Sequence, residues 1–163
     1  MMLATRRFFL WVALAMVLMA ALVVPGSPGR AGNQDFPGEV VKAAVQTIAP
    51  GGAELVVVPQ VPEGFQWLKE APMQVKVTSQ DQAVVSFGGK AVAGCRQPRF
   101  PWRVRLRAQP GETRLQVDLI LSYCKKGKGG LCITKQVRLN LPVKVEAAAQ
   151  NRKLRAAYKP PAL

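Results

Sequence analysis

Two cysteines constrain the fold of this chain more than any other feature. They lie at the facing ends of two segments in which apolar and polar residues alternate. Residues 115–124 and 132–141 each carry an apolar side chain at nearly every second position. Such alternation predicts two strands with one buried face. The seven residues between Cys124 and Cys132 are mostly glycine and lysine, and they can form a turn. The sequence therefore predicts a β-hairpin with Cys124 facing Cys132 at its end.

This pairing sets the register of the whole hairpin. With the cysteines opposite each other, Asp118 faces Arg138 on the polar face, and Leu119 faces Val137 on the apolar face. A slip of one residue would turn the apolar side chains of one strand into water. Lys135, which falls opposite a leucine, is the one residue that does not fit. Both cysteines have the parity of the polar face, so we expect the pair to face solvent.

Residues 1–31 are predicted to be a signal peptide rather than part of the fold. Arg6 and Arg7 precede an apolar run at 8–24, and a segment rich in small residues ends at Ala31, where we expect cleavage. The arginine pair favours a twin-arginine signal, whereas the long apolar run favours an ordinary secretory signal. A retained membrane anchor is the alternative to cleavage, because the run nearly reaches spanning length. The expected location is periplasmic or secreted.

The region 35–146 is predicted to form a single all-β domain. Short strands separated by Gly and Pro turns predict an antiparallel β-sandwich of about seven strands. The expected strands are 40–48, 54–61, 73–79, 83–87, 102–108, 113–123 and 132–145. Residues 147–163 have a short helical composition followed by Lys-Pro-Pro, and we expect a flexible basic tail there.

The composition excludes most classes of active site. The chain contains no histidine, which excludes Ser-His-Asp and Cys-His catalysis and the usual histidine-based metal sites. Its nine acidic residues are scattered, and no glycine-rich phosphate loop follows a strand and opens a helix. We predict no metal and no cofactor, and only thiol chemistry remains.

The strong positive charge bears on the partners. The chain has 23 Lys and Arg against 9 Asp and Glu, a net charge of +14. An exported protein rarely meets nucleic acid, and the basic residues are scattered along strands rather than clustered with aromatic residues on a helix. We therefore predict no nucleic-acid partner and expect attraction to an anionic membrane surface or an acidic partner.

Three interpretations of the Cys124 and Cys132 pair remain open. In the first, a disulfide holds the hairpin together, as most disulfides of exported proteins do. In the second, the pair is redox-active. Lys125, Lys126 and Lys128 are expected to favour the thiolate of Cys124 and so to lower its pKa, and a disulfide on a solvent face is open to attack by a partner's thiolate. In the third, the remaining cysteine of the chain joins the pair in a metal site.

That remaining cysteine is Cys95. It follows Gly94 in what we predict to be a loop, and its simplest interpretation is a small buried apolar side chain. The alternatives are a free thiol that forms mixed disulfides or a dimer, and the third ligand of the metal site.

Two parts of the sequence resemble a bacterial family. Residues 123–132, followed by 137–143, look like the cysteine hairpin of the immunoglobulin-like periplasmic domain that begins the transmembrane thiol:disulfide interchange reductase DsbD. Residues 61–72 resemble the segment of the same family that runs from Pro-Gly-aromatic to Glu-Ala-Pro. A similar domain ends proteins that carry a thioredoxin domain and NHL repeats, and there the cysteines have the spacing found here.

The resemblance implies an immunoglobulin-like β-sandwich in which Cys124 and Cys132 carry electrons. It implies thioredoxin-like or other periplasmic thiol proteins as partners, with a membrane electron carrier as a further one. The leading prediction is therefore a periplasmic thiol:disulfide interchange domain, an oxidoreductase. The competing prediction is a non-enzymatic exported binding or accessory module whose disulfide is purely structural.

Overall fold

The computed structural model of this chain describes residues 36–127 and 130–161. The predicted signal peptide at 1–31, and Lys128 of the predicted lysine cluster, lie outside the described residues. The described part contains no helix, and therefore none long and apolar enough to cross a membrane. Its strands are β1 (Glu39–Lys42), β2 (Gln46–Ile48), β3 (Gly51–Pro59), β4 (Phe65–Trp67), β5 (Gln74–Ser79), β6 (Val85–Ser86), β7 (Val92–Arg96), β8 (Trp102–Ala108), β9 (Gly111–Lys125), β10 (Cys132–Val145) and β11 (Lys153–Tyr158).

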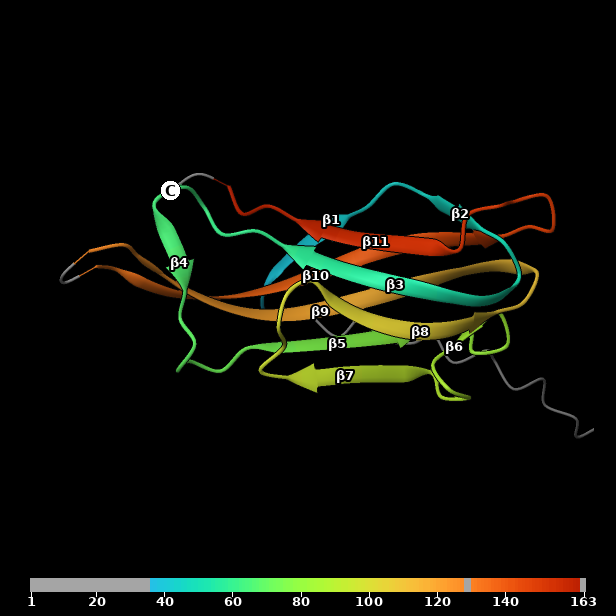
Figure 1. The fold of residues 1–163 in the computed structure, drawn as a ribbon, viewed down its shortest axis with the longest axis horizontal. Helices are drawn as coiled ribbons and strands as arrows, with labels where there is room; N and C mark the ends of the chain where they lie inside the picture. Colours follow the sequence, from blue (N-terminus) through green and yellow to red (C-terminus); the bar gives the residue numbers. More distant parts are fainter. Residues whose placement is uncertain (1–35, 128–129, 162–163) are drawn as a thin grey trace, which may run out of the picture. The chain divides into compact units, whose positions relative to one another are not determined.

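The strands form two sheets that pack face to face as a β-sandwich (Figure 1). Sheet A has the order β1-β10-β9-β5-β7, with β2 also paired with β10 and β4 with β9. Sheet B has the order β11-β3-β8-β6. The predicted all-β sandwich is confirmed, but the described part has eleven strands rather than about seven. It is also not wholly antiparallel, because β1 and β2 run parallel to β10, and β11 runs parallel to β3.

The core lies between the sheets and follows from the alternation within each strand. Leu115 and Val117 of β9, and Leu55 and Val57 of β3, are wholly buried. The residues between them point to the opposite face of the same strand. Burying side chains of this size contributes about 1.5–3 kcal/mol each. A register slip would expose the whole set at once, so this burial holds each strand in its register.

The segment predicted as one strand at 40–48 is divided into β1 and β2. Lys42 pairs with Asn140 of β10 and Gln46 pairs with Val143, so three residues of the segment lie opposite two of β10. One extra residue of this kind is a β-bulge, which interrupts the hydrogen-bonded ladder. Pro142 lies within the interrupted stretch and has no backbone N–H to donate.

Two short strands, β4 and β7, are absent from the sequence-based prediction. β4 has only three residues, and β7 contains Gly94 in the middle of its five, so neither shows a clear alternation. Cys95, predicted in a loop, lies within β7, which pairs with β5 at the edge of sheet A. The prediction for Cys95 was therefore wrong about its local structure.

The flexible basic tail predicted at 147–163 is wrong over the residues of β11. This strand pairs with β3, and its residues Leu154, Ala156 and Tyr158 are buried. Alanine and basic residues have high helix propensity, but here the burial of alternate side chains outweighs it. The sandwich therefore extends beyond the predicted boundary at residue 146.

We expect Leu154→Ala to lower the free energy of unfolding by about 2–5 kcal/mol, because it leaves a cavity in the core. Arg155→Ala, at the next and exposed position of β11, should change it by no more than about 0.5 kcal/mol. Urea denaturation followed by tryptophan fluorescence measures both. Equal and small effects of the two variants would show that β11 is not part of the core.

Candidate functional site

The predicted hairpin register is confirmed along β9 and β10. Cys124 lies opposite Cys132 and forms a disulfide with it, with the two sulfur atoms 2.09 Å apart and the two Cα atoms 4.0 Å apart. Lys125 donates its backbone N–H to the Leu131 carbonyl at 2.9 Å, so the neighbouring pair is hydrogen-bonded. The cysteines therefore occupy a non-hydrogen-bonded pair, where opposing Cα atoms come closest. Gly127 has φ of 116° in the turn, a conformation that favours glycine.

Farther along the hairpin, the predicted charge pair is also present. Arg138 donates from Nε to Asp118 Oδ1 at 2.7 Å and from Nη2 to Oδ2 at 2.9 Å. A two-pronged ion pair of this kind adds geometric specificity to the register. It also raises the pKa of the guanidinium, because hydrogen bonds to the carboxylate favour the charged form.

The prediction that both cysteines face solvent is confirmed for Cys132 and is wrong for Cys124. Cys124 is only 8% exposed, whereas Cys132 is exposed. The cause is the neighbouring strands: β4 pairs with β9 and places Gln66 beside Cys124 (Figure 1). On the other side, β1 pairs with β10 only from Val137 onward. Cys132 is therefore the half of the disulfide that is more open to a thiolate approaching from solvent.

The polar face beside the cysteines is more covered than the sequence predicts. Ser122 is wholly buried, because the segment before β5 lies over it and its hydroxyl donates to the Pro72 carbonyl at 3.2 Å. The same hydroxyl is 3.0 Å from the Thr134 hydroxyl. Leu68 donates its N–H to the Ser122 carbonyl at 3.0 Å. Ser122 lies on the same face of β9 as Cys124, the face predicted to be polar, but the alternation gave no sign of the loop that covers this face.

An aromatic cluster holds the inner side of β9 directly beneath the disulfide. The ring of Tyr123, next to Cys124, lies 5.6 Å from the Phe65 ring and 6.4 Å from the Trp67 ring, both edge-on. Trp67 in turn packs on Phe100 at 5.4 Å. Edge-on pairs contribute about 0.5–1.5 kcal/mol beyond their buried area. The cluster therefore fixes the strand that carries Cys124.

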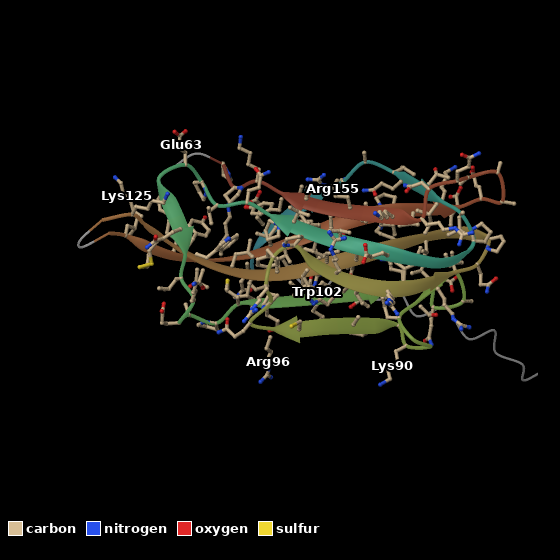
Figure 2. The ribbon with its side chains drawn as sticks, viewed as in Figure 1. Glu63, Lys90, Arg96, Trp102, Lys125 and Arg155 are labelled. Carbon is tan, nitrogen blue, oxygen red and sulfur yellow. A yellow bond between two sulfur atoms is a disulfide. The ribbon has the colours of Figure 1, made fainter. Side chains whose placement is uncertain are left out.

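Two of the three predicted lysines lie within the described residues. Lys125 and Lys126 are exposed, and Figure 2 labels Lys125 near the outer end of the hairpin. Lys126 donates its N–H to the Gly64 carbonyl at 2.8 Å, which ties the start of the turn to the segment before β4. The predicted effect of these lysines on the Cys124 thiol stays a prediction.

Lys135, which did not fit the pattern, has charged and aromatic partners that the sequence did not indicate. Its Nζ lies 2.6 Å from Glu39 Oε2 and 5.7 Å from the centre of the Tyr158 ring. The Tyr158 hydroxyl donates to the same Glu39 oxygen at 2.9 Å. Strands β1, β10 and β11 are thus joined by one polar cluster. Lys135 is used in this cluster, on the face of β10 opposite to that of Cys132.

The pKa values of this cluster shift in directions that favour the ion pair. Hydrogen bonds from Lys135 and Tyr158 lower the pKa of Glu39, although desolvation acts against them. Desolvation lowers the pKa of Lys135, but hydrogen bonds to Glu39 and Tyr158 outweigh it, so the net shift is upward. Burial raises the pKa of the Tyr158 phenol, so its hydroxyl remains a donor at neutral pH.

Cys95 does not join the pair. It is partly buried in β7, opposite Val75 of β5, and it forms no disulfide. Its Sγ lies 3.3 Å from the Arg96 carbonyl. Within residues 36–127 and 130–161, no group of three or more His, Cys, Asp or Glu side chains is placed to hold a metal ion. The cysteines of the described part therefore form one disulfide and one free thiol.

Comparisons with known proteins add no assignment: no protein-family model matches the chain, and no curated protein matches it.

We expect the cluster around Glu39 to make stability depend on pH. Because the pKa of Glu39 is lowered from 4.5 on folding, its contribution is present above that value and is lost as the pH falls through the folded value. Glu39→Gln should therefore destabilise the protein by about 1 kcal/mol at pH 7, and by less near pH 3.

Urea denaturation across the acid range tests this expectation. Glu63→Gln is a matched control, because Glu63 is exposed and lies in no ion pair of the described part. If Glu39→Gln cost the same at both pH values, the ion pair with Lys135 would not be the source of the effect.

We expect reduction of the disulfide to lower the free energy of unfolding by about 2.6 kcal/mol, from the entropy of the short loop that it closes. The double variant Cys124→Ala/Cys132→Ala should show a similar loss, and Cys95→Ala serves as a control for thiol removal. Chemical denaturation with and without a phosphine reductant measures the difference. An unchanged midpoint would mean that the strand pairing alone holds the hairpin.

Proposed function

We propose that this chain is an exported thiol:disulfide interchange domain that uses the Cys124–Cys132 disulfide. The observation that carries the proposal is the exposure of Cys132 in a disulfide whose other half is buried. The resemblance of the hairpin to the periplasmic domain of DsbD supports the same activity. The predicted signal peptide supports a periplasmic or secreted location, where such a disulfide can form.

The reaction is an exchange of two electrons and needs no cofactor. A thiolate of a partner dithiol attacks the Cys132 sulfur, a mixed disulfide forms, and the bond to Cys124 breaks with release of the Cys124 thiolate. The second thiolate of the partner then attacks the partner's own sulfur in the mixed disulfide and releases the Cys132 thiolate. The partner becomes a disulfide, and the chain holds two thiols. In the reverse direction the chain reduces an oxidised protein.

The lysines beside the turn act on the leaving group. Thiol–disulfide exchange is faster when the departing thiol has a lower pKa. Cys124 is that departing thiol, and nearby ammonium groups favour its thiolate form. Lys125 and Lys126, next along the chain, are therefore the residues that we expect to assist the release of Cys124.

Thioredoxin-like or other periplasmic thiol proteins are the proposed partners, with a membrane electron carrier as a further source of electrons. Such partners present a reactive thiolate on their own surface, which suits an exposed sulfur at the outer end of a hairpin. Contact with an anionic membrane surface is compatible with this role, because the chain carries a net charge of +14.

One observation favours the competing function, a non-enzymatic accessory module with a structural disulfide. Cys124 is shielded by β4 and lies above a packed aromatic cluster, and burial of this kind resists reduction. The two functions predict different reduction potentials and different rates of thiol exchange. Each of these two quantities can be measured.

The first prediction of the proposal concerns the reduction potential. Equilibration of the disulfide with glutathione or thioredoxin should give a value less negative than about −300 mV, whereas structural disulfides lie below that value. A potential in the structural range, together with no exchange with thioredoxin, would leave only the accessory function.

The second prediction concerns which sulfur reacts, and it uses matched single-cysteine variants. In a Cys95→Ala background, Cys124→Ala leaves the exposed Cys132, and Cys132→Ala leaves the shielded Cys124. The variant that keeps Cys132 should form a mixed disulfide with an oxidised thioredoxin-like protein, or with the reagent DTNB, severalfold faster. Equal rates would contradict the role assigned to β4.

A further inference from the structure

The outer face of sheet B carries a group of basic side chains at matching positions of two strands. We call this group the basic face; it consists of Arg103, Arg105 and Arg107 of β8 with Lys153 and Arg155 of β11, all of them exposed. β3 lies between these strands, with Glu54 between Arg105 and Lys153. Side chains on one face of a strand recur every second residue, so the register alone sets them on one side of the sheet.

The charges of the basic face are almost unopposed. Glu54 is the one acidic residue in the strands of sheet B, and it is bound to Arg103 at 2.9 Å. The other four cations of the basic face lie in no ion pair within the described residues. On sheet A, Arg138 and Lys144 are each paired with a carboxylate, whereas Lys76 of β5 and Arg96 of β7 are exposed and lie in no ion pair of the described part. The outer face of sheet B thus holds four unpaired cations, and its one carboxylate is already paired.

A hollow of about 510 Å³ opens within this face. Its floor includes Gly52 of β3, where an added Cβ atom would meet nothing within 4 Å. Arg105, Arg107, Arg152 and Lys153 line it together with one carboxylate, that of Glu54, already bound to Arg103. Four cationic side chains around a glycine floor offer N–H donors and space to a phosphate group.

We infer that the basic face docks on an anionic phospholipid bilayer, with a lipid phosphate in the hollow above Gly52. A bilayer surface presents many phosphates at one level, which complements cations spread over one side of a sheet. Single-stranded nucleic acid is a poorer fit, because its binding uses stacked aromatic side chains, and the strands that carry these cations place their aromatic residues, Trp102 and Tyr158, at inward or partly covered positions.

Two further features agree with docking at a membrane. The apolar run at 8–24 is predicted to target the chain to a membrane, whether it is cleaved as a signal or retained as an anchor. Cys132 has the parity of Arg138 on the outer face of sheet A, and the basic face is on the outer side of sheet B. Docking through sheet B therefore leaves the disulfide open to a soluble partner.

Vesicle flotation of the full chain tests the inference, with phosphatidylcholine vesicles alone or with about one third phosphatidylglycerol. The apolar run contributes to binding of both vesicle types, so the measured quantity is the preference for the anionic ones. Wild-type protein should show a strong preference that weakens with added salt. Each basic side chain near the bilayer contributes about a fivefold gain in affinity. A variant in which three of these side chains are replaced by neutral ones should therefore show a preference for anionic vesicles that is weaker by about a hundredfold.

The two variants to compare each remove three positive charges. The basic-face variant is Arg105→Gln/Arg107→Gln/Lys153→Gln. The control is Lys76→Gln/Lys90→Gln/Arg96→Gln, whose exposed residues lie in or beside β5 and β7; Figure 2 shows Lys90 and Arg96 pointing away from the sandwich at that edge. The control should keep most of the preference. Urea denaturation tests whether both triple variants are folded. If the basic-face variant is not folded, the single variant Arg107→Gln replaces it, and its expected loss of preference is about fivefold.

Three outcomes would overturn the inference. Equal losses in both triple variants would mean that net charge alone attracts the protein. No preference of the wild-type protein for anionic vesicles would exclude lipid docking. Binding of soluble polyglutamate in preference to anionic vesicles, with loss in the basic-face variant, would assign this face to an acidic polypeptide instead.

Discussion

The ladder between β9 and β10 is the constraint on which the rest of the structure depends. It runs without interruption from the pair Gly111–Val145 to the pair Cys124–Cys132. All the other strands of sheet A pair with β9 or β10, except β7, which is held by β5. Buried aliphatic side chains hold its register on one face and an ion pair holds it on the other. The place of the two cysteines is therefore set by packing along the whole hairpin.

The same ladder places its two cysteines in different surroundings, and this difference links the fold to the proposed chemistry. β4 flanks β9 at Cys124, whereas no strand of the described part flanks β10 at Cys132. The sheet thus selects which sulfur is attacked. The adjacent lysines then act on the sulfur that leaves. The sequence pointed to Cys124 as the thiol of lower pKa, and in the exchange proposed here that property belongs to the leaving group, where a low pKa accelerates the reaction.

Sequence reasoning was successful where one strong periodicity dominates and failed where several weak signals act together. The hairpin register followed from alternation and two charges, because a one-residue error would have exposed many side chains at once. The cover over Cys124 was not predictable, since β4 has three residues and its pairing is non-local. The cluster of Lys135 with Glu39 and Tyr158 joins strands far apart in the sequence, so no local pattern contains it.

β11 shows most clearly why composition misled. Its inward residues are leucine, alanine and tyrosine, and Lys153, Arg155 and Ala157 alternate with them, which is a weak strand signal and an acceptable helix signal. β3 offers it a paired edge, and the core offers its inner side chains a buried site. Because successive side chains of a strand point to opposite faces, burial of one set directs the other set to solvent. Lys153 and Arg155 must face outward, on the same side of the sheet as the arginines of β8 and across β3 from them. The positive charge that the sequence assigned to a flexible tail is thereby held on a rigid sheet, where its effect on a charged surface is greatest.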